Sequence, residues 1–287
     1  MNRTADVVIV GAGVIGSATA FELAKRGYKT LNIDKLPASG YGSTSNSCAI
    51  VRAHYSTWDG VAMAYEGFFY WDDWNKYLEV EDERGMAKYM KTGSIMFMLK
   101  GADHSKKSLN LFKEIGVEHE IWDLETLKKK MPIYSHDSYN GTSRPDKDDS
   151  FFDKSGDQIE GAVWTPGSGY VSDPQLATHN LQVATEAKGG EFLFDAEITE
   201  IRQSNGQIQG VTLKSGEQID CKVLVNVAGP HSFIINQMVG VEDDMNIKTK
   251  ALRHEVHHVS SPPGFDFEKN GVHTSDGDNA IYFRPET

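Results

Sequence analysis

Two histidines and a glutamate near the C-terminus have the spacing of a zinc-protease motif. His254, Glu255 and His258 read H-E-x-x-H, which on a helix places both imidazoles on one face, where they can bind zinc. The surrounding sequence does not favour that helix, because residues 251–263 alternate in polarity and end at two consecutive prolines. We therefore expect a strand here and no metal site.

A glycine-rich turn near the N-terminus has the spacing of a phosphate-binding motif. Gly11, Gly13 and Gly16 read G-x-G-x-x-G directly after the unbroken apolar run of residues 7–10. Such a run is typical of a strand that is buried on both faces, and the helical pattern that follows it ends at Gly27. The first glycine allows a tight turn, the second lets the backbone approach a pyrophosphate, and the third lets helix and strand pack closely.

Asp34 completes this unit. It follows a second apolar run, residues 30–33, at about the distance where dinucleotide-binding proteins place an acid. Its carboxylate can accept hydrogen bonds from both ribose hydroxyls and would repel a 2′-phosphate. The order of strand, glycine turn, helix, strand and acid predicts a dinucleotide-binding βαβ unit, against the weaker alternative of a glycine turn that binds nothing. The pattern leaves FAD and NAD both open.

The overall composition limits the remaining classes of protein. A chain of 287 residues with 39% hydrophobic residues can bury one large core or two ordinary ones. A net charge of −12 without a Lys/Arg cluster disfavours nucleic acid. The apolar runs are too short for a membrane span, and the N-terminus has no leader-type segment. Cys48 and Cys221 lack metal-ligand or redox spacing, so we expect a cytoplasmic protein.

The segments between these motifs differ in character. Residues 36–47 are small and polar, and either bring N–H groups and hydroxyls to a cofactor or form a plain loop. The aromatic residues of 65–77 have helical spacing and predict a core-packing helix. Residues 134–160 are polar and turn-rich, and predict a surface insertion or a mobile loop.

The second half of the chain returns to regular structure. Asp173 and Pro174 are typical of a helix start, and Gly189 is typical of a helix end. Strands are then predicted at 192–202, 207–214 and 218–227.

Six blocks of the sequence, taken in order, resemble the FAD-dependent D-amino acid oxidase superfamily. The blocks are "VVIVGAGVIGSATAFELAKRG", "GSTSNSCAIVRAHY", "GYVSDPQLATHNLQVATEAKGG", "VLVNVAGPHS", "RHEV" and "IYFRPET". Members of this superfamily include sarcosine oxidase, glycine oxidase and dimethylglycine dehydrogenase. The resemblance covers essentially the whole chain, implies FAD and not NAD, and implies truncation at the C-terminus, because members continue beyond "YFRPET".

The fold implied by the resemblance is α/β, with two interleaved domains. A Rossmann-type FAD-binding domain with a parallel sheet would comprise residues 1–85 and 162–238. An α+β substrate domain on an antiparallel sheet would comprise residues 86–161 and 239–287, incomplete at the C-terminus.

The function implied is oxidation of the C–N bond of a small amino acid or N-methyl amino acid of the sarcosine or glycine type. Hydride would pass to flavin N5, water would hydrolyse the resulting imine, and oxygen or an electron-transfer protein would be the acceptor. FAD is expected to be noncovalent, because "STSNSC" lacks the histidine that tethers the flavin in dimethylglycine-dehydrogenase-like members. The alternatives are a 2-hydroxy-acid oxidoreductase of the same superfamily and a noncatalytic or incomplete FAD-binding subunit that needs a partner chain.

The resemblance also implies site residues. Arg52 matches the arginine that holds the substrate carboxylate in sarcosine-oxidase-like members. Arg284 is a second candidate, Tyr282 lies beside it on a strand expected to face the flavin, and His54 ranks below them. The expected cofactor-binding residues are Gly11, Gly13, Val14, Ile15, Gly16, Asp34, Lys35, Ser43, Thr44, Ser45, Asn46, Ile198, Ala228 and Gly229.

Overall fold

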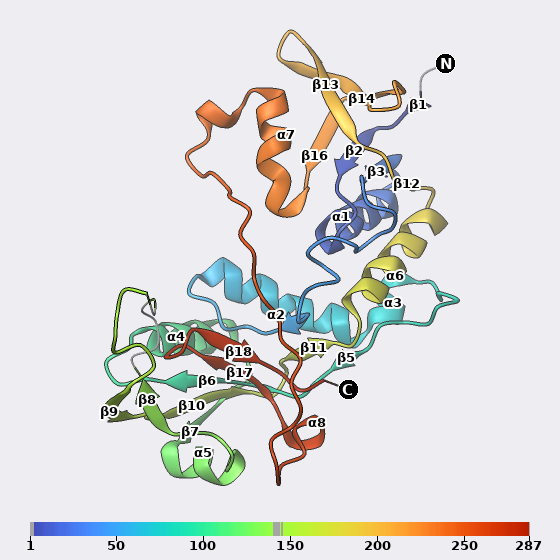
Figure 1. Cartoon of the computed structure of the whole chain (residues 1–287). Coiled ribbons are helices and arrows are strands. Elements are labelled where there is room, and N and C mark those ends of the chain that lie inside the picture. The colour runs from blue at the N-terminus through green and yellow to red at the C-terminus, as the bar shows by residue number, and fades with distance from the viewer. Residues whose placement is uncertain (1–2, 140–143, 145, 287) are drawn as a thin grey trace. The chain divides into compact units, whose positions relative to one another are not determined.

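The computed structural model describes residues 3–139, 144 and 146–286 (Figure 1). The chain divides into two compact units, each assembled from three segments. Unit 1 comprises Met1–Ser47, Trp74–Ala87 and Asp173–His257, and unit 2 comprises Cys48–Asp73, Lys88–Ser172 and His258–Thr287. The assignment of residues 1–85 and 162–238 to an FAD-binding domain stays a prediction. The division into compact units shows which segments pack together and does not show which of them bind FAD.

Unit 1 is built on a four-stranded parallel sheet in the order β12-β3-β2-β16. Its strands are β2 (Val7–Val10), β3 (Thr30–Ile33), β12 (Glu191–Leu193) and β16 (Val223–Asn226). The two central strands, β2 and β3, are buried along their whole length, as their apolar runs predict. The helices of unit 1 are α1 (Val14–Lys25), α3 (Trp74–Leu78), α6 (Pro174–Ala187) and α7 (Ser232–Val239), with 3-10 turns at Gly229–His231 and Glu242–Asp244.

The parallel sheet of unit 1 packs on both faces. On one face, Ile9 contacts Ala20 of α1, and α1 in turn packs along α6. On the other face, Val8 and Val10 share a core with Ile201 and Val211 of a second sheet. That sheet has the order β1-β15-β14-β13 and consists of β1 (Arg3–Thr4), β13 (Ile198–Ser204), β14 (Gln207–Leu213) and β15 (Gln218–Asp220).

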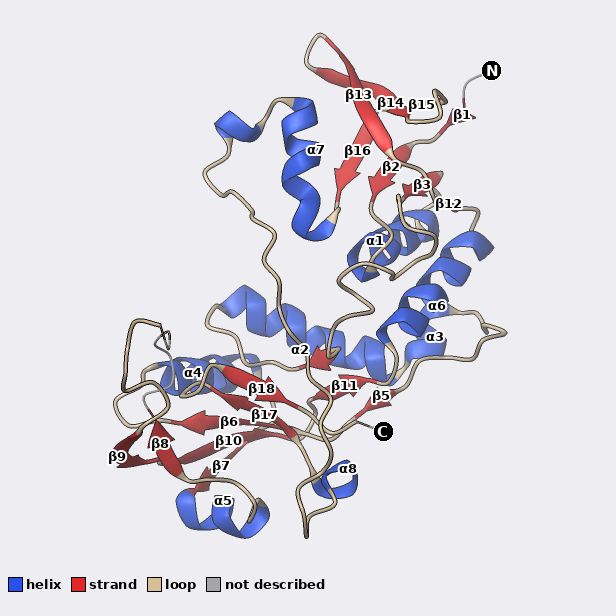
Figure 2. Cartoon of the chain, viewed as in Figure 1, coloured by secondary structure: helices blue, strands red, loops and turns tan. Residues whose placement is uncertain are grey.

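Unit 2 is built on a five-stranded mixed sheet in the order β18-β17-β6-β10-β7 (Figure 2). All neighbouring strands are antiparallel except β17 and β6. The strands are β6 (Ser94–Met98), β7 (Glu120–Asp123), β10 (Gly161–Thr165), β17 (His273–Asp276) and β18 (Ile281–Phe283). A three-stranded sheet has the order β4 (Ile50–Val51), β11 (Gly169–Val171) and β5 (Tyr89–Met90). A two-stranded sheet consists of β8 (Asp137–Tyr139) and β9 (Lys154–Gln158).

Helices cover both faces of this five-stranded sheet. Met96 and Val163 contact α2 (Trp58–Asp72) and α4 (His104–Ile115) on one face. Ile95 and Ala162 contact α5 (Leu124–Lys130) on the other face, and the short helix α8 (Phe267–Asn270) precedes β17. The predicted class, an α/β fold that combines a parallel sheet with an antiparallel one, is confirmed. No helix of the described ranges is long and apolar enough to span a bilayer.

Three predicted elements are divided in the structure. The strand predicted at 192–202 is split between β12 and β13, which belong to different sheets, because the chain turns at Asp195 with a φ of +51°. The strand predicted at 218–227 is likewise split between β15 and β16. The helix predicted at 65–77 breaks at Asp73 into α2 and α3, and its aromatic residues are not all core residues, since Phe69 is 59% exposed.

Two other predicted segments differ from the structure, the first only in containing paired strands. Residues 134–160, predicted as a surface insertion or mobile loop, contain the paired strands β8 and β9, of which β9 is exposed along its whole length, while 140–143 and 145 lie outside the described residues. The strand predicted at 251–263 is absent, although the segment is also not helical. Its alternating side chains are exposed, with Val259 at 77%, because no strand of the described chain pairs with it.

Candidate cofactor and substrate sites

The glycine turn of unit 1 is a place of very close backbone approach. Gly11 has a φ of +112°, and a Cβ there would lie 2.5 Å from the carbonyl oxygen of Val227. A Cβ on Gly16 would lie 2.0 Å from the carbonyl oxygen of Gly11. Only glycine fits at either position, because both clashes are with backbone atoms that cannot rotate away. The turn thereby holds the start of α1 directly against β2.

The N-terminus of α1 is free to receive an anion. Its N-cap, Gly13, provides no side-chain hydrogen bond, and no acid lies in the first turn. A Cβ on Gly13 would meet only the Thr44 hydroxyl, at 3.2 Å, and that hydroxyl accepts a hydrogen bond from the Val14 amide at 3.1 Å. Ile15, the second residue of α1, is 67% exposed, so this end of the helix faces solvent. Unpaired N–H groups and the helix dipole make such an end a site for phosphate groups.

The polar loop after β3 is tied to the glycine turn. The Gly40 amide donates to the carbonyl of Ala12 at 2.8 Å, and Thr44 adds the contact to α1. Ser43 and Asn46 lie in the same turn-rich segment, where the Ser45 amide donates to the Gly40 carbonyl.

Asp34 lies at the end of β3 with both carboxylate oxygens engaged by backbone. One oxygen accepts from the Ala12 amide at 2.8 Å and the other from the Leu36 amide at 2.9 Å. Each carboxylate oxygen has a second lone pair, so both can still accept a ribose hydroxyl. Lys35, beside it, is exposed.

The other predicted cofactor residues lie further along unit 1. Ala228 and Gly229 follow β16, and Gly229 has a φ of +60° with open space where a Cβ would stand. Ile198 is 7% exposed and packs in the core between the two sheets. Its side chain therefore has a clear structural role.

The two predicted arginines of unit 2 differ in their pairing. Arg52 is half-buried, donates to the Ser275 hydroxyl at 3.2 Å, and has its guanidinium 5.7 Å from the Tyr55 ring centre. No carboxylate of the described residues pairs with it. Arg284 donates to the Cys48 carbonyl at 2.6 Å, contacts Glu286 at 2.8 Å, and stacks on a tyrosine ring. Of the two arginines, Arg52 is the one without a carboxylate partner among the described residues.

Tyr282 lies on the same face of the sheet as the partner of Arg52. Ser275 on β17 is directly opposite Tyr282 on β18, and directly opposite residues of an antiparallel pair point to one face. Tyr282 is 53% exposed. The register thus brings Arg52, Ser275 and Tyr282 together.

His54 is buried and uncharged. Its Nε2 lies 3.2 Å from the Thr165 hydroxyl, while Nδ1 has no partner among the described residues. Burial, followed by the charge of nearby His273 and Arg52, lowers the pKa of His54 to about 3. The side chain is a hydrogen-bonding group at neutral pH and not an acid.

Two residues of this region were not predicted from the sequence, Ser275 and His273. Both lie on β17, which pairs with β18 across the turn of residues 277–280, and this register places Ser275 opposite Tyr282 and within hydrogen-bond distance of Arg52. The turn-forming residues Gly277, Asp278 and Asn279 between two short β-type segments are the signal that indicates such a hairpin.

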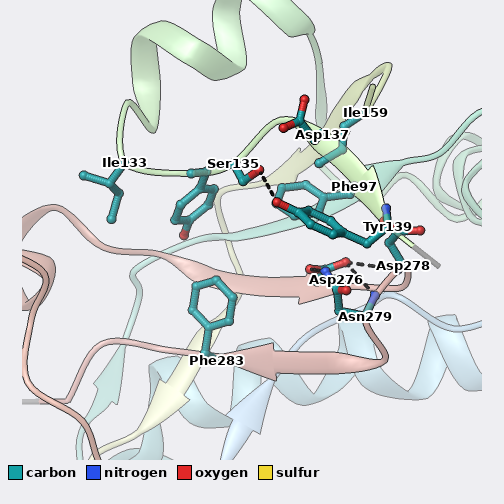
Figure 3. Close-up of a pocket in the computed structure, with 11 residues that line it drawn as sticks. Phe97, Ile133, Ser135, Asp137, Tyr139, Ile159, Asp276, Asp278, Asn279 and Phe283 are labelled. Carbon is teal, nitrogen blue, oxygen red and sulfur yellow. Dashed lines mark hydrogen bonds between the residues drawn. The ribbon is translucent and has the colours of Figure 1, made fainter. Parts of the chain in front are cut away.

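A cavity of about 200 Å³ opens on the face of the five-stranded sheet opposite to the face that carries Ser275 and Tyr282 (Figure 3). Phe97 and Phe283 contribute apolar surface, and Asp276 and Asp278 contribute carboxylates. None of the predicted site residues lines it. Its acidic lining disfavours a carboxylate ligand, because like charges repel.

Comparison with protein families gives one decisive match. Residues 6–287 match the family model described as DAO, FAD dependent oxidoreductase. The chain belongs to this family.

Individual members of the family are similar at low identity. The chain is 29% identical to the monomeric sarcosine oxidase of Bacillus sp. (strain B-0618), over 83% of this chain and 55% of that protein. It is 25% identical to the mitochondrial pyruvate dehydrogenase phosphatase regulatory subunit of Mus musculus, over 98% of this chain and 29% of that protein. The solved L-proline dehydrogenase from P.horikoshii has the same fold, with a TM-score of 0.68 and 22% identity over 84% of this chain and 57% of that one.

Membership confirms FAD, and not NAD, as the cofactor, and the residues of unit 1 fit that group. Gly13 and the start of α1, where Thr44 accepts from the Val14 amide, suit the pyrophosphate, and Asp34 suits the ribose. The chain spans clearly less than two thirds of the length of each relative named above.

Proposed function

We propose that the protein oxidises the C–N bond of a small amino acid or N-methyl amino acid, with FAD held noncovalently by unit 1 and the substrate carboxylate held by Arg52 of unit 2. The observation that carries this proposal is the half-buried Arg52 guanidinium, to which no acid of the described chain is paired. A cation in this state is best explained by an anionic ligand. The names of two relatives, sarcosine oxidase and L-proline dehydrogenase, support the substrate class.

Each side chain of the site has a separate task. Arg52 has a planar fork that can donate two parallel hydrogen bonds to a carboxylate, which fixes the orientation of the α-carbon. Ser275 holds one Nη of Arg52, and Tyr55 lies against the guanidinium. Bound FAD supplies the hydride acceptor. His54 is not the group that deprotonates the substrate amine, because its pKa of about 3 makes it a very weak base.

Arg52→Lys is expected to raise the dissociation constant of a carboxylate ligand about tenfold, because lysine cannot form the bidentate pair. The measurement is isothermal titration of the chain with N,N-dimethylglycine. Arg253→Lys is the matched control, since Arg253 is exposed and lies outside the site. An unchanged constant in Arg52→Lys would remove Arg52 from the carboxylate site.

The reaction itself is tested by visible absorption of the chain reconstituted with FAD. Anaerobic addition of sarcosine or glycine is expected to bleach the flavin band near ~450 nm, because only a flavin placed against a donor carbon is reduced. Bleaching by glycolate or lactate but not by amines would instead indicate a 2-hydroxy-acid oxidoreductase. Oxygen or an electron-transfer protein would reoxidise the flavin, and the rate with each distinguishes oxidase from dehydrogenase.

A noncatalytic FAD-binding subunit is the second candidate. It is favoured by the match to a protein named as a regulatory subunit, which extends over 98% of this chain. This candidate predicts a yellow protein that no amine or hydroxy acid bleaches unless a partner chain is added.

A further inference from the structure

A row of buried polar side chains crosses the five-stranded sheet of unit 2. Thr165 on β10 is paired with Ser94 on β6, and Ser94 is paired with His273 on β17. Residues that are paired across neighbouring strands point to the same face, so the three side chains lie side by side. All three are fully buried, and His54 joins the row through Thr165.

Hydrogen bonds within this row leave one atom of His273 unused. The Ser94 hydroxyl lies 2.6 Å from Nδ1 of His273, and the Thr165 hydroxyl bonds the carbonyl of Ser94. Nε2 of His273 is buried and has no partner among the described residues. A buried polar atom without a partner costs about 1–3 kcal/mol, so a group outside the described chain is expected to supply one.

The unused nitrogen belongs to a residue beside the Arg52 site. Ser275, which accepts the hydrogen bond of Arg52, lies two residues after His273 on β17 and therefore on the same face. After burial, the charge of Arg52 is the largest cause that lowers the pKa of His273, to about 3. The imidazole is therefore neutral at physiological pH.

Other roles for His273 agree less well with these observations. Among the described residues, His54 also has one unbonded nitrogen, Nδ1, so the missing partner distinguishes His273 only together with its position two residues before Ser275 on the same face of β17. A general base would need a pKa near neutrality. No group of three potential metal ligands occurs among the residues that the structure describes.

We propose that His273 is a binding residue of the carboxylate site, with Nε2–H donating a hydrogen bond to an oxygen of the anion that Arg52 holds. The Ser94 hydroxyl would donate to Nδ1 and thereby fix the tautomer that carries the proton on Nε2. One charged and one neutral donor would then recognise a single negative charge. This inference rests on the function proposed for Arg52.

The test uses the full chain with ¹⁵N-labelled histidine and N,N-dimethylglycine as the probe. Long-range ¹H–¹⁵N spectra should show the Nε2–H tautomer of His273 before addition and a shift of its Nε2 resonance at saturation. His273→Phe keeps a ring of similar size without the donor and is expected to raise the dissociation constant about tenfold or more, the usual effect of losing a hydrogen bond to a charged group. His273→Gln, which retains a donor, should recover part of the affinity, and His257→Phe at an exposed position is the control.

The outcomes separate this inference from the proposed function. The role of His273 is overturned, and that of Arg52 is kept, if Arg52→Gln loses binding while His273→Phe has an unchanged dissociation constant. The same conclusion follows if the Nε2 resonance of the unmodified chain does not move when the probe is added. Unchanged binding in Arg52→Gln, or no binding of the probe to the unmodified chain, overturns both. The spectra of the unmodified chain decide the matter if His273→Phe does not fold.

Discussion

Gly16→Ala is expected to raise the dissociation constant of FAD about 100-fold and to destabilise unit 1 by about 2–3 kcal/mol, the cost of overpacking a rigid contact. The new Cβ would lie 2.0 Å from the carbonyl oxygen of Gly11, so α1 must move away from β2. That movement would displace the N–H groups at the start of α1 that we expect to bind the pyrophosphate. Flavin fluorescence quenching gives the constant, and urea unfolding gives the stability.

Two other glycines provide matched controls for this substitution. Gly67 in α2 has open space at its Cβ position, so Gly67→Ala is expected to be neutral or to stabilise by about 0.5–1 kcal/mol. A Cβ on Gly13 would meet only Thr44, so Gly13→Ala should leave unit 1 folded and still weaken FAD, because the methyl group would occupy the space of the phosphate. If Gly13→Ala and Gly16→Ala both bind FAD as tightly as the unmodified chain does, the cofactor does not contact this turn.

Acid is expected to destabilise unit 2 by about 5 kcal/mol between pH 6.5 and 4.5. The folded pKa values of His54 and His273 are both about 3, below the ordinary 6.5, mainly because burial penalises the charged imidazole. The unfolded chain therefore takes up protons first, and the free energy of unfolding falls as the pH drops below 6.5 and continues to fall toward pH 3. Each histidine contributes about 2.3 kcal/mol over these two pH units, because the unfolded imidazole is already half protonated at pH 6.5.

Urea unfolding at a series of pH values between 7.5 and 4.5 measures this effect. His54→Gln should remove about half of the pH dependence, and His257→Gln should remove none, because His257 is exposed. An equal pH slope in His54→Gln and the unmodified chain, or an imidazole resonance of His54 that titrates near pH 6.5 in the folded state, would contradict the prediction.

The parts of the fold that could be predicted from the sequence are those with local signals. The apolar runs of β2 and β3, the glycine turn and Asp34 are adjacent in the chain, so their pattern is sufficient. The divided strands at 192–202 and 218–227 were not predicted, because the chain passes between sheets without a glycine or proline to mark the change. The segment 251–263 has the alternation of a strand but lacks a partner, and alternation alone does not satisfy backbone hydrogen bonds.

The candidate site was predictable only in part. Arg52 was identified through the resemblance to a family, since a lone arginine after a short apolar run has no local signature that assigns it a ligand. His273 and Ser275 depend on the register of β17 with β6 and β18, which links positions almost 180 residues apart in the case of Ser94 and His273. Their roles follow from burial and pairing, which are properties of the folded chain.

The assembly of each unit from three separate segments has a consequence for the order in which the chain folds. In the parallel sheet of unit 1, β2 pairs with β16, so that Val7 is opposite Val223, and in unit 2, β6 pairs with β17. During synthesis, β2 and β6 leave the ribosome long before these partners exist, and neither sheet can be completed until the second half of the chain is made. Pairings this distant in sequence are slow to form and leave apolar edges open to aggregation in the meantime. The nascent chain is therefore expected to depend on chaperones that shield β2 and β3, and refolding from urea should be far slower than for a domain of similar size with local contacts.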